Sequence, residues 1–161
     1  MTYTYHLADP ILDLEEILHL YKRHYGEMKA RLAEAGIEIG AFNPRVDAYA
    51  GAFQAGRLLH YVVRADGKAV GYSNVYITSD MHNGELIARE DTIYVHPNHR
   101  KGCGRKLMKE ILLDLQRRGV KRFIGTASTD PRATKLWERM GFRPAGLTMM
   151  YVFEGSPHVR A

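Results

Sequence analysis

The spacing of apolar side chains in the first third of the chain predicts helices. The apolar residues that recur at intervals of three and four positions are Leu14, Ile17, Leu18, Tyr21, Tyr25, Met28 and Leu32. This spacing places them on one face of a helix over about residues 9–35, with Asp9 as its cap and Pro10 in its first turn. Gly26 interrupts the pattern, which leaves two shorter helices as an alternative. A second short helix is expected over residues 45–55.

From residue 58 the apolar positions alternate with polar ones, which predicts strands. The stretch "LLHYVVRADGKAVGYSNVYITS" predicts two strands joined by a turn at Asp66 and Gly67, a pair typical of hairpins. The stretch "LIAREDTIYVHP" predicts a third strand that ends at Pro97. These three strands should form an antiparallel meander.

Helical spacing returns after Gly104 and then alternates with strands. The apolar face of this next helix consists of Leu107, Met108, Ile111, Leu112 and Leu115. Gly119 ends the helix, "KRFIGTAS" predicts a strand, and "DPRATKLWERM" predicts a short helix capped by Asp130. The segment "GLTMMYVFE" predicts a last strand. A strand, a helix and a strand in succession form a crossover, so its two strands should be parallel, and the fold class is α+β.

Composition favours one ordinary globular domain over residues 1–161, with 45% hydrophobic and 25% charged residues. No apolar run approaches the roughly 18 residues that span a bilayer, and no signal peptide is visible, so we expect a cytoplasmic protein without a membrane partner. The net charge is +5. Its main source is a basic stretch with Arg100, Lys101, Arg105, Lys106, Lys109, Arg117, Arg118, Lys121 and Arg122. Such a stretch indicates either a solvated surface or an anionic partner.

The sequence "HPNHRKGCGRKLMKE", residues 96–110, combines glycines and cations where a strand passes into a helix. The first turn of a helix has backbone N–H groups without internal partners, and glycines let a ligand approach them, so the segment is suited to a phosphate group. Arg100, Lys101 and Arg105 would add positive charge. The dinucleotide motif Gly-x-Gly-x-x-Gly is not completed, because Leu107 stands in the last glycine's place.

Two linked motifs carry a resemblance to a known family. The stretch "IYVHPNHRKGCGRKLMKEILLDLQRRGVKRFIGTAS", followed by "DPRATKLWERMGFRPAG", resembles the GCN5-related N-acetyltransferase (GNAT) superfamily. The resemblance covers about residues 90–146 and implies a central mixed sheet of about six to seven strands with about four helices. This chain departs from the family motifs at three positions, where His99 stands for Arg or Gln, Asp130 for Asn, and Trp137 for Tyr.

The resemblance implies acetyl-CoA as co-substrate and an amine of a small molecule or protein as acceptor. It also allows a homodimer. The residues that it implies for cofactor binding are Tyr94, Val95, His99, Arg100, Lys101, Gly102, Cys103, Gly104, Arg105, Asp130 and Trp137. The phosphate donors themselves would lie within residues 99–105.

In relatives a carboxylate on the strand before the loop often deprotonates the amine, which points to Glu90 or Asp91. Strand side chains alternate, so we expect at most one of the two to face the substrate, and we prefer Glu90. A backbone N–H near Tyr94 or Val95 would stabilise the oxyanion. In relatives a tyrosine at the position of Trp137 often protonates the leaving thiolate, but an indole is no acid at neutral pH. Tyr94 or Tyr151 would therefore protonate the thiolate, or the thiolate would leave unaided.

Two other functions stay open at this point. One is a basic nucleic-acid-binding domain that uses the helix from Arg105 to Lys121, although no reading motif accompanies it. The other is a CoA-binding protein without catalysis, which the substitution at Trp137 would permit. A metal site is not expected, because the chain's histidine-rich loop lacks further ligands at suitable spacing.

Cys103 is the single cysteine of the chain, so no internal disulfide can form. Its place near a helix N-terminus among cations predicts a lowered pKa and allows a nucleophilic or redox role. It also occupies the variable position between Gly102 and Gly104, which favours a small residue that only fills space.

Overall fold

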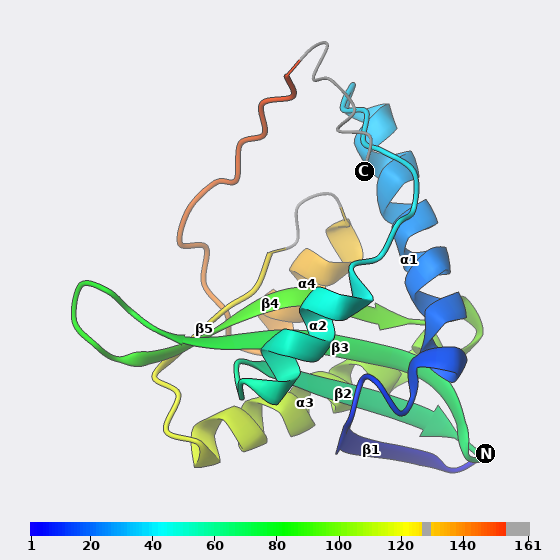
Figure 1. Ribbon diagram of the computed structural model, residues 1–161, viewed down its shortest axis with the longest axis horizontal. Helices are drawn as coiled ribbons and strands as arrows, with labels where there is room; N and C mark the ends of the chain where they lie inside the picture. The colour runs from blue at the N-terminus through cyan, green and yellow to red at the C-terminus, as the bar shows by residue number, and fades with distance from the viewer. Residues whose placement is uncertain (127–129, 154–161) are drawn as a thin grey trace.

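A computed structural model of the chain describes residues 1–126 and 130–153. Within these residues one five-stranded sheet runs in the order β1 to β5 (Figure 1). The strands are β1 (Tyr3–Ala8), β2 (Leu58–Ala65), β3 (Lys68–Ser79), β4 (Leu86–Val95) and β5 (Arg122–Ile124). The first four pair antiparallel and β4 pairs parallel with β5, which confirms the α+β fold, the meander and the parallel pair.

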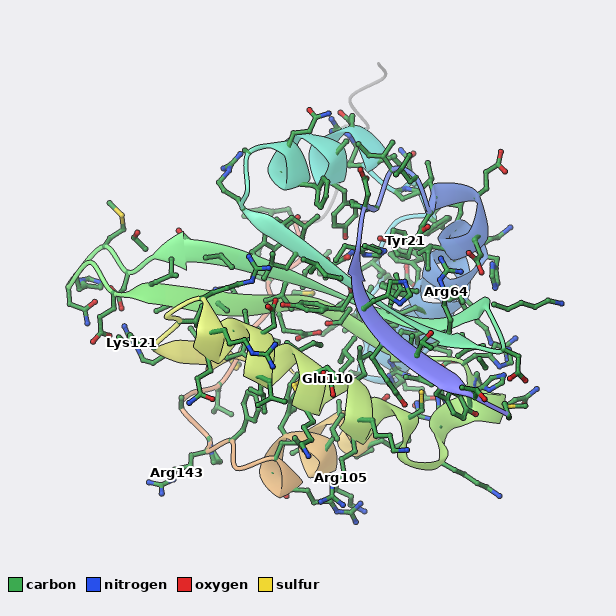
Figure 2. The ribbon with its side chains drawn as sticks, turned by 90° about the horizontal axis from the view of Figure 1, so that it is seen from below. Tyr21, Arg64, Arg105, Glu110, Lys121 and Arg143 are labelled. Atoms are coloured by element: carbon green, nitrogen blue, oxygen red, sulfur yellow. The ribbon has the colours of Figure 1, made fainter. Side chains whose placement is uncertain are left out.

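Helices cover both faces of this sheet. They are α1 (Leu14–Glu34), α2 (Val46–Gln54), α3 (Arg100–Arg117) and α4 (Pro131–Arg139), with a 3-10 turn η1 (Pro97–His99) before α3. Figure 2 shows α1 and α2 on one side of the sheet and α3 and α4 on the other. On the first side Ile17 and Leu20 of α1 pack against Val62 of β2, all at most 1% exposed. On the second side Leu107 and Ile111 of α3 pack against the other face.

At two positions the structure of the backbone explains why the residue is glycine. In the turn between β2 and β3, Asp66 and Gly67 both have positive φ, 47° and 85°. Two consecutive residues with positive φ are the requirement of the tight hairpin turn that the sequence predicts. At Gly71 in β3 a Cβ atom would lie 2.7 Å from the carbonyl oxygen of Tyr94 and 2.8 Å from a methyl group of Val63. This position therefore leaves room for glycine only.

The first helix begins later than predicted. Asp9 does not cap it, because its carboxylate accepts a hydrogen bond from the backbone N–H of Ile11 and closes a local turn, at 2.8 Å. The N-cap position is Asp13, and α1 continues without a break through Gly26. The alternative of two shorter helices is therefore wrong. The second helix, α2, agrees with the prediction to within one residue at each end.

The count of six to seven strands is wrong for the described residues, which form five. The segment predicted as a last strand, residues 146–154, has no strand over 146–153, and residue 154 lies outside the described residues. A strand is held by backbone hydrogen bonds to a neighbour, and β5, which forms that edge of the sheet, has only three residues to offer. Of the predicted strand over 121–128, positions 127 and 128 also lie outside the described residues. Strand β1 was not anticipated.

Candidate active site

The centre of the site is a β-bulge in β4. Asn74 of β3 pairs with Thr92, and the next residue, Val75, pairs with Glu90, so Asp91 is the extra residue between them. The bulge re-aims the chain, and both Glu90 and Asp91 line one cavity of about 560 Å³. We expected strict alternation to place the two side chains on opposite faces, with at most one facing the substrate. The alternation fails at the bulge, whereas the prediction of which carboxylate faces the substrate stays a prediction.

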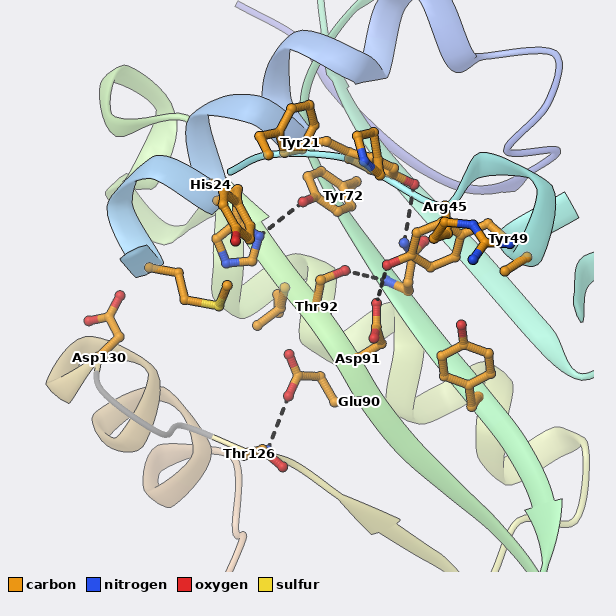
Figure 3. Close-up of a pocket in the computed structure, with 18 of the residues that line it drawn as sticks. Tyr21, His24, Arg45, Tyr49, Tyr72, Glu90, Asp91, Thr92, Thr126 and Asp130 are labelled. Atoms are coloured by element: carbon orange, nitrogen blue, oxygen red, sulfur yellow. Dashed lines mark hydrogen bonds between the residues drawn. The ribbon is translucent and has the colours of Figure 1, made fainter. Parts of the chain in front are cut away.

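Glu90 is almost fully buried, with 8% of its surface exposed. Its carboxylate accepts a hydrogen bond from the backbone N–H of Thr126, just after β5, at 3.1 Å (Figure 3). Burial is the main reason that its pKa rises from 4.5 to about 7; the bond from Thr126 lowers it and the charge of Asp91 raises it. Glu90 forms no ion pair within the described part of the chain. A carboxylate with this pKa can exchange protons at neutral pH.

Asp91 has different surroundings. Its side chain is open to the cavity, and it accepts a hydrogen bond of 2.7 Å from the hydroxyl of Tyr49 on α2. The surrounding protein atoms remove enough water to raise the pKa of Asp91, while the bond from Tyr49 opposes that rise. Figure 3 shows Glu90 pointing toward Thr126 and Asp91 pointing toward Tyr49. One cavity thus contains two carboxylates that point to different walls.

Aromatic rings form much of the cavity wall. They come from α1, from the segment before α2, from α2 and from β3, and they are Tyr21, Tyr25, Phe42, Tyr49, Tyr72 and Tyr76. His24 also lines the cavity, with Nδ1 at 2.9 Å from the hydroxyl of Tyr72. Burial, helped by the charge of Arg31, lowers the pKa of His24 to about 4, so the imidazole is neutral at pH 7.

The glycine loop has the backbone geometry of an anion site. Lys101 (φ −65°, ψ 86°) and Gly102 (φ 82°) depart from helical geometry, so the regular part of α3 begins after them. The first turn contains no acidic residue, and Lys101 and Arg105 are exposed beside it. Space around Gly102 is open, and at Gly104 an added Cβ would have only ordinary contacts, to Leu136 and Val95. Free N–H groups, a helix dipole and two cations therefore meet at one accessible turn.

Two of the predicted phosphate donors are engaged elsewhere. The ring of His99 contacts Tyr3 of β1, with Nδ1 at 3.1 Å from the phenol oxygen. Arg100 donates from Nε to the carbonyl of Val95 at 2.8 Å, and from Nη2 to both carboxylate oxygens of Glu27 on α1, at 3.1 and 2.8 Å. These contacts tie the loop to β4 and α1, so neither side chain is free to turn toward a phosphate without losing them.

Tyr94 belongs to the same network. Its hydroxyl donates to Glu27 at 2.9 Å, its ring stacks on His24, and the guanidinium of Arg100 lies 5.4 Å from the ring centroid. Tyr94 is 4% exposed and is not one of the residues that line the cavity. Tyr151, the other acid considered, is 79% exposed on the C-terminal segment and does not line it either. Val95 is buried beside this network.

Two further predicted residues lie on α4. Asp130 caps the helix as expected, accepting from the backbone N–H of Arg132 at 3.0 Å, and it also lines the cavity. Trp137 is 5% exposed and packs against Phe123 and Phe142. Its indole Nε1 is buried and has no hydrogen-bond partner among the residues that the structure describes. A buried N–H in this state favours a ligand group that could accept from it.

The structure contradicts the expectation that the pKa of Cys103 is lowered. Cys103 is 3% exposed, and its sulfur accepts a weak hydrogen bond from the hydroxyl of Tyr5, at 3.7 Å. Burial raises the pKa of this thiol and outweighs the bond from Tyr5 and the charge of Lys106. The residue therefore fills space in the core. Among the described residues no group of three His, Cys, Asp or Glu could hold a metal ion, and none of the helices is long and apolar enough to cross a bilayer.

Sequence reasoning missed several residues of the site. Tyr49 and Tyr76 lie far from either motif in the sequence, and no local pattern distinguishes them from core or surface positions. Thr126 lies within the first motif, but nothing in the sequence marks its backbone N–H as a partner of Glu90. Tyr21 was assigned only to the apolar face of a helix. The five tyrosines of the wall come from three separate elements, so they are a compositional signal at most, and only the fold brings them together.

A sheet whose last two strands are parallel, a bulge with two carboxylates and a glycine turn at a helix N-terminus suit a group-transfer enzyme of α+β class. A family model described as the acetyltransferase (GNAT) family matches residues 14–142. The chain therefore belongs to the GNAT family of acetyltransferases, which are acyltransferases. No curated protein matches the sequence.

Solved structures agree on the fold. An aminoglycoside acetyltransferase from an uncultured soil metagenomic sample has a TM-score of 0.73 at 17% identity, covering 95% of this chain and 99% of that one. A ribosomal-protein-alanine N-acetyltransferase from Brucella melitensis biovar Abortus 2308 has 0.68 at 20% identity, covering 96% and 100%. A GCN5-related N-acetyltransferase from Ralstonia eutropha JMP134 has 0.73 at 19% identity, covering 94% and 99%. At these identities the likeness shows a shared fold.

Proposed function

We propose that this protein transfers the acetyl group of acetyl-CoA to the amine of an acceptor bound in the cavity, with Glu90 as the general base. The observation that carries this proposal is the buried Glu90, whose pKa is about 7, on the wall of the cavity. Membership of the acetyltransferase family supports the reaction class.

The amine must be neutral to attack. A lysine-like ammonium has a pKa near 10.4, so only about one molecule in 2,500 is neutral at pH 7. Ionised Glu90 accepts a proton from the ammonium, and the nitrogen then bonds to the acetyl carbon while the carbon–sulfur bond breaks. The second proton that the nitrogen loses ends on the departing thiolate. A thiol with a pKa near 8.5 is a good leaving group, so this step needs little help from an acid.

The residues around the loop fit acetyl-CoA, which would supply the activated acetyl group as a thioester. The backbone N–H groups of residues 102–105 and the cations Lys101 and Arg105 suit its pyrophosphate. The buried Trp137 Nε1, without a partner among the described residues, suits an acceptor atom of the pantetheine arm or the thioester. Arg100 contributes by positioning, because its bonds to Glu27 and the Val95 carbonyl hold the loop beside β4.

A nucleic-acid partner is not favoured. The residues on the inner face of α3 are buried in the core, and the basic residues on its outer face are interrupted by Glu110 (Figure 2). No aromatic platform for bases accompanies them among the described residues.

The first experiment is calorimetric titration with acetyl-CoA. We expect micromolar binding by the unmodified protein and its loss in a Gly102→Glu, Gly104→Glu double variant. The matched control is a Gly26→Glu, Gly146→Glu double variant, which adds the same charge at positions where a Cβ meets nothing within 4 Å. Absence of binding by the folded, unmodified protein would reject the proposal.

The second experiment separates catalysis from binding alone. With any amine that is turned over, Glu90→Gln should lower kcat by about 100-fold or more while acetyl-CoA affinity is kept. The control is Glu110→Gln, the same change at an exposed carboxylate on the outer face of α3. Equal kcat in Glu90→Gln and the unmodified enzyme would remove Glu90 from the mechanism.

A further inference from the structure

The proposed reaction uses one of the two carboxylates in the cavity and leaves Asp91 without a role. Asp91 is the bulged residue of β4, and its side chain is open to the cavity. Within the described residues it has no lysine, arginine or histidine partner, and the hydroxyl of Tyr49 is its one side-chain hydrogen-bond donor there. A carboxylate in a concave site without a cation is poorly compensated, and a cationic ligand would compensate it.

Tyrosines surround this carboxylate. Burial raises the pKa of Tyr21, Tyr49 and Tyr76, and the negative charge of Asp91 raises each of them further, so all three phenols lie within its field. The rings of Tyr21 and Tyr49 are 5.9 Å apart at their centroids. Ring faces attract cations through their quadrupole, and the attraction is strongest where water is excluded.

The hydroxyls of these tyrosines are largely committed to protein partners. Tyr49 donates to Asp91, and Tyr21 accepts from the side-chain amide of Asn74 at 3.1 Å. Tyr25, farther along the wall, donates to the carbonyl of Gly40 at 2.8 Å. Ring surface therefore makes up much of the wall beside Asp91, and such a surface suits a cation on an alkyl chain.

Cationic side chains at the cavity do not neutralise Asp91. Arg31 pairs with Asp130 and Glu27, at 3.7 and 3.8 Å, and Arg45 pairs with Asp47 at 2.6 Å. His24 is neutral at pH 7, because its pKa is about 4. The remaining charge at the centre of the cavity is negative, so a positive ligand group is attracted there and an anion is repelled.

The two carboxylates cannot both serve the amine that reacts. Glu90 points toward Thr126 between β4 and β5, whereas Asp91 points toward α2 and Tyr49 (Figure 3). We propose that Asp91 and the rings of Tyr21, Tyr49 and Tyr76 bind a second cationic group of the acceptor, which makes the acceptor a small dication such as a diamine. This inference rests on the proposed function, because it assigns the reacting amine to Glu90.

The binding half of the proposal can be tested without catalysis. The probe is tetramethylammonium, which has no N–H to acetylate, titrated into the protein and followed by NMR shifts of the tyrosine rings. We expect Asp91→Asn to weaken its binding by about tenfold or more, and Tyr76→Leu to weaken it several-fold. Tyr76→Phe, which keeps the ring, should restore the affinity lost in Tyr76→Leu. The charge control is Asp66→Asn, the same change in the β2–β3 turn.

The selectivity half uses matched pairs of amines, propylamine with 1,3-diaminopropane and butylamine with 1,4-diaminobutane. We expect a diamine-to-monoamine ratio of kcat/KM of about ten or more, which falls toward one in Asp91→Asn. Measurements at pH 8.5 keep Glu90 ionised in both proteins, because the charge of Asp91 contributes to its raised pKa.

The outcomes distinguish this inference from the proposed function. Acetylation of monoamines and diamines at equal rates, with the ratio unchanged in Asp91→Asn, overturns the inference and leaves the acetyltransferase activity standing. Tetramethylammonium binding that depends on Asp91, without acetylation of any amine, supports the cation site and rejects the proposed activity. Tetramethylammonium binding of equal strength in Asp91→Asn overturns the site itself.

Discussion

Replacing Glu90 by glutamine should make the protein more stable, and only toward alkaline pH. The side chain is 8% exposed, and burial raises its pKa from 4.5 to about 7. In the unfolded chain the carboxyl ionises near its ordinary value. The folded state therefore holds the proton more tightly than the unfolded state does, and ionised Glu90 opposes folding.

The size of the effect follows from the pKa shift. A group with a raised folded pKa contributes stability that is fully present below about pH 4.5 and is lost as the pH rises through about 7. At ~1.36 kcal/mol for each unit of pKa, the loss above pH 7 is about 3 kcal/mol. The pKa of about 7 already includes the effect of the bond from the Thr126 N–H, which the glutamine oxygen can still accept. We therefore expect a net gain of about 3 kcal/mol at pH 8.5.

The assay is urea unfolding of both proteins at a series of pH values from 4.5 to 8.5. The difference in unfolding free energy should be small at the acid end and grow through pH 7 in favour of Glu90→Gln. Taking the difference between the two proteins cancels the titration of other groups. Glu110→Gln should show no such rise, because that side chain is exposed. A difference that does not change with pH would show that burial does not hold Glu90 neutral, and would remove the physical basis for its role as a base.

Three further predictions test the packing around the site by urea unfolding and thiol labelling. Gly71→Ala should lower the free energy of unfolding by about 2 kcal/mol, because the new Cβ would lie 2.7 Å from a backbone carbonyl oxygen of β4. The control Gly40→Ala has open space around the new Cβ and should change the stability little. Equal effects of the two substitutions would contradict the contact. Glu27→Ala should lower the free energy of unfolding by about 1–2 kcal/mol, because Arg100 and Tyr94 lose the carboxylate that both bind. An unchanged stability would show that these contacts of Glu27 do not stabilise the fold. Cys103, buried and with a raised pKa, should react with a thiol reagent only on unfolding, and rapid labelling of the native protein would refute its burial.

Much of the fold could be predicted from the sequence, because the decisive signals are local. The alternation on either side of Asp66 and Gly67 gives β2 and β3, and the turn needs only the positive φ that these two residues adopt. The apolar spacing after Gly104 gives α3, and Gly119, with φ 80°, follows its end. A strand, a helix and a strand then leave few topologies open, so the parallel pairing of β4 and β5 also follows.

The errors occur where structure depends on partners distant in sequence. Residues 146–153 alternate well enough to predict a strand, but a strand also needs a neighbour with a free edge of sufficient length. Strand β1 shows the opposite case. Its apolar pattern is too short to be recognised in the sequence, and its pairing with β2 over six residues stabilises it as a strand. Arg100 was expected to face a phosphate, and only the approach of α1 brings Glu27 within reach of its guanidinium.

The bulge in β4 had no signal in the sequence, and the site depends on it. With regular alternation Glu90 and Asp91 would face opposite sides of the sheet, and the cavity would contain one carboxylate. One extra residue brings both to the same cavity in contrasting surroundings. A general base at neutral pH needs a raised pKa, which the burial of Glu90 supplies. A cation site needs a carboxylate that a ligand can reach, which the open position of Asp91 supplies. On our proposal the bulge in β4 therefore determines both the proton transfer by Glu90 and the selection of the acceptor by Asp91. A change that removes the bulge should alter the rate of acetylation and the preference for diamines together.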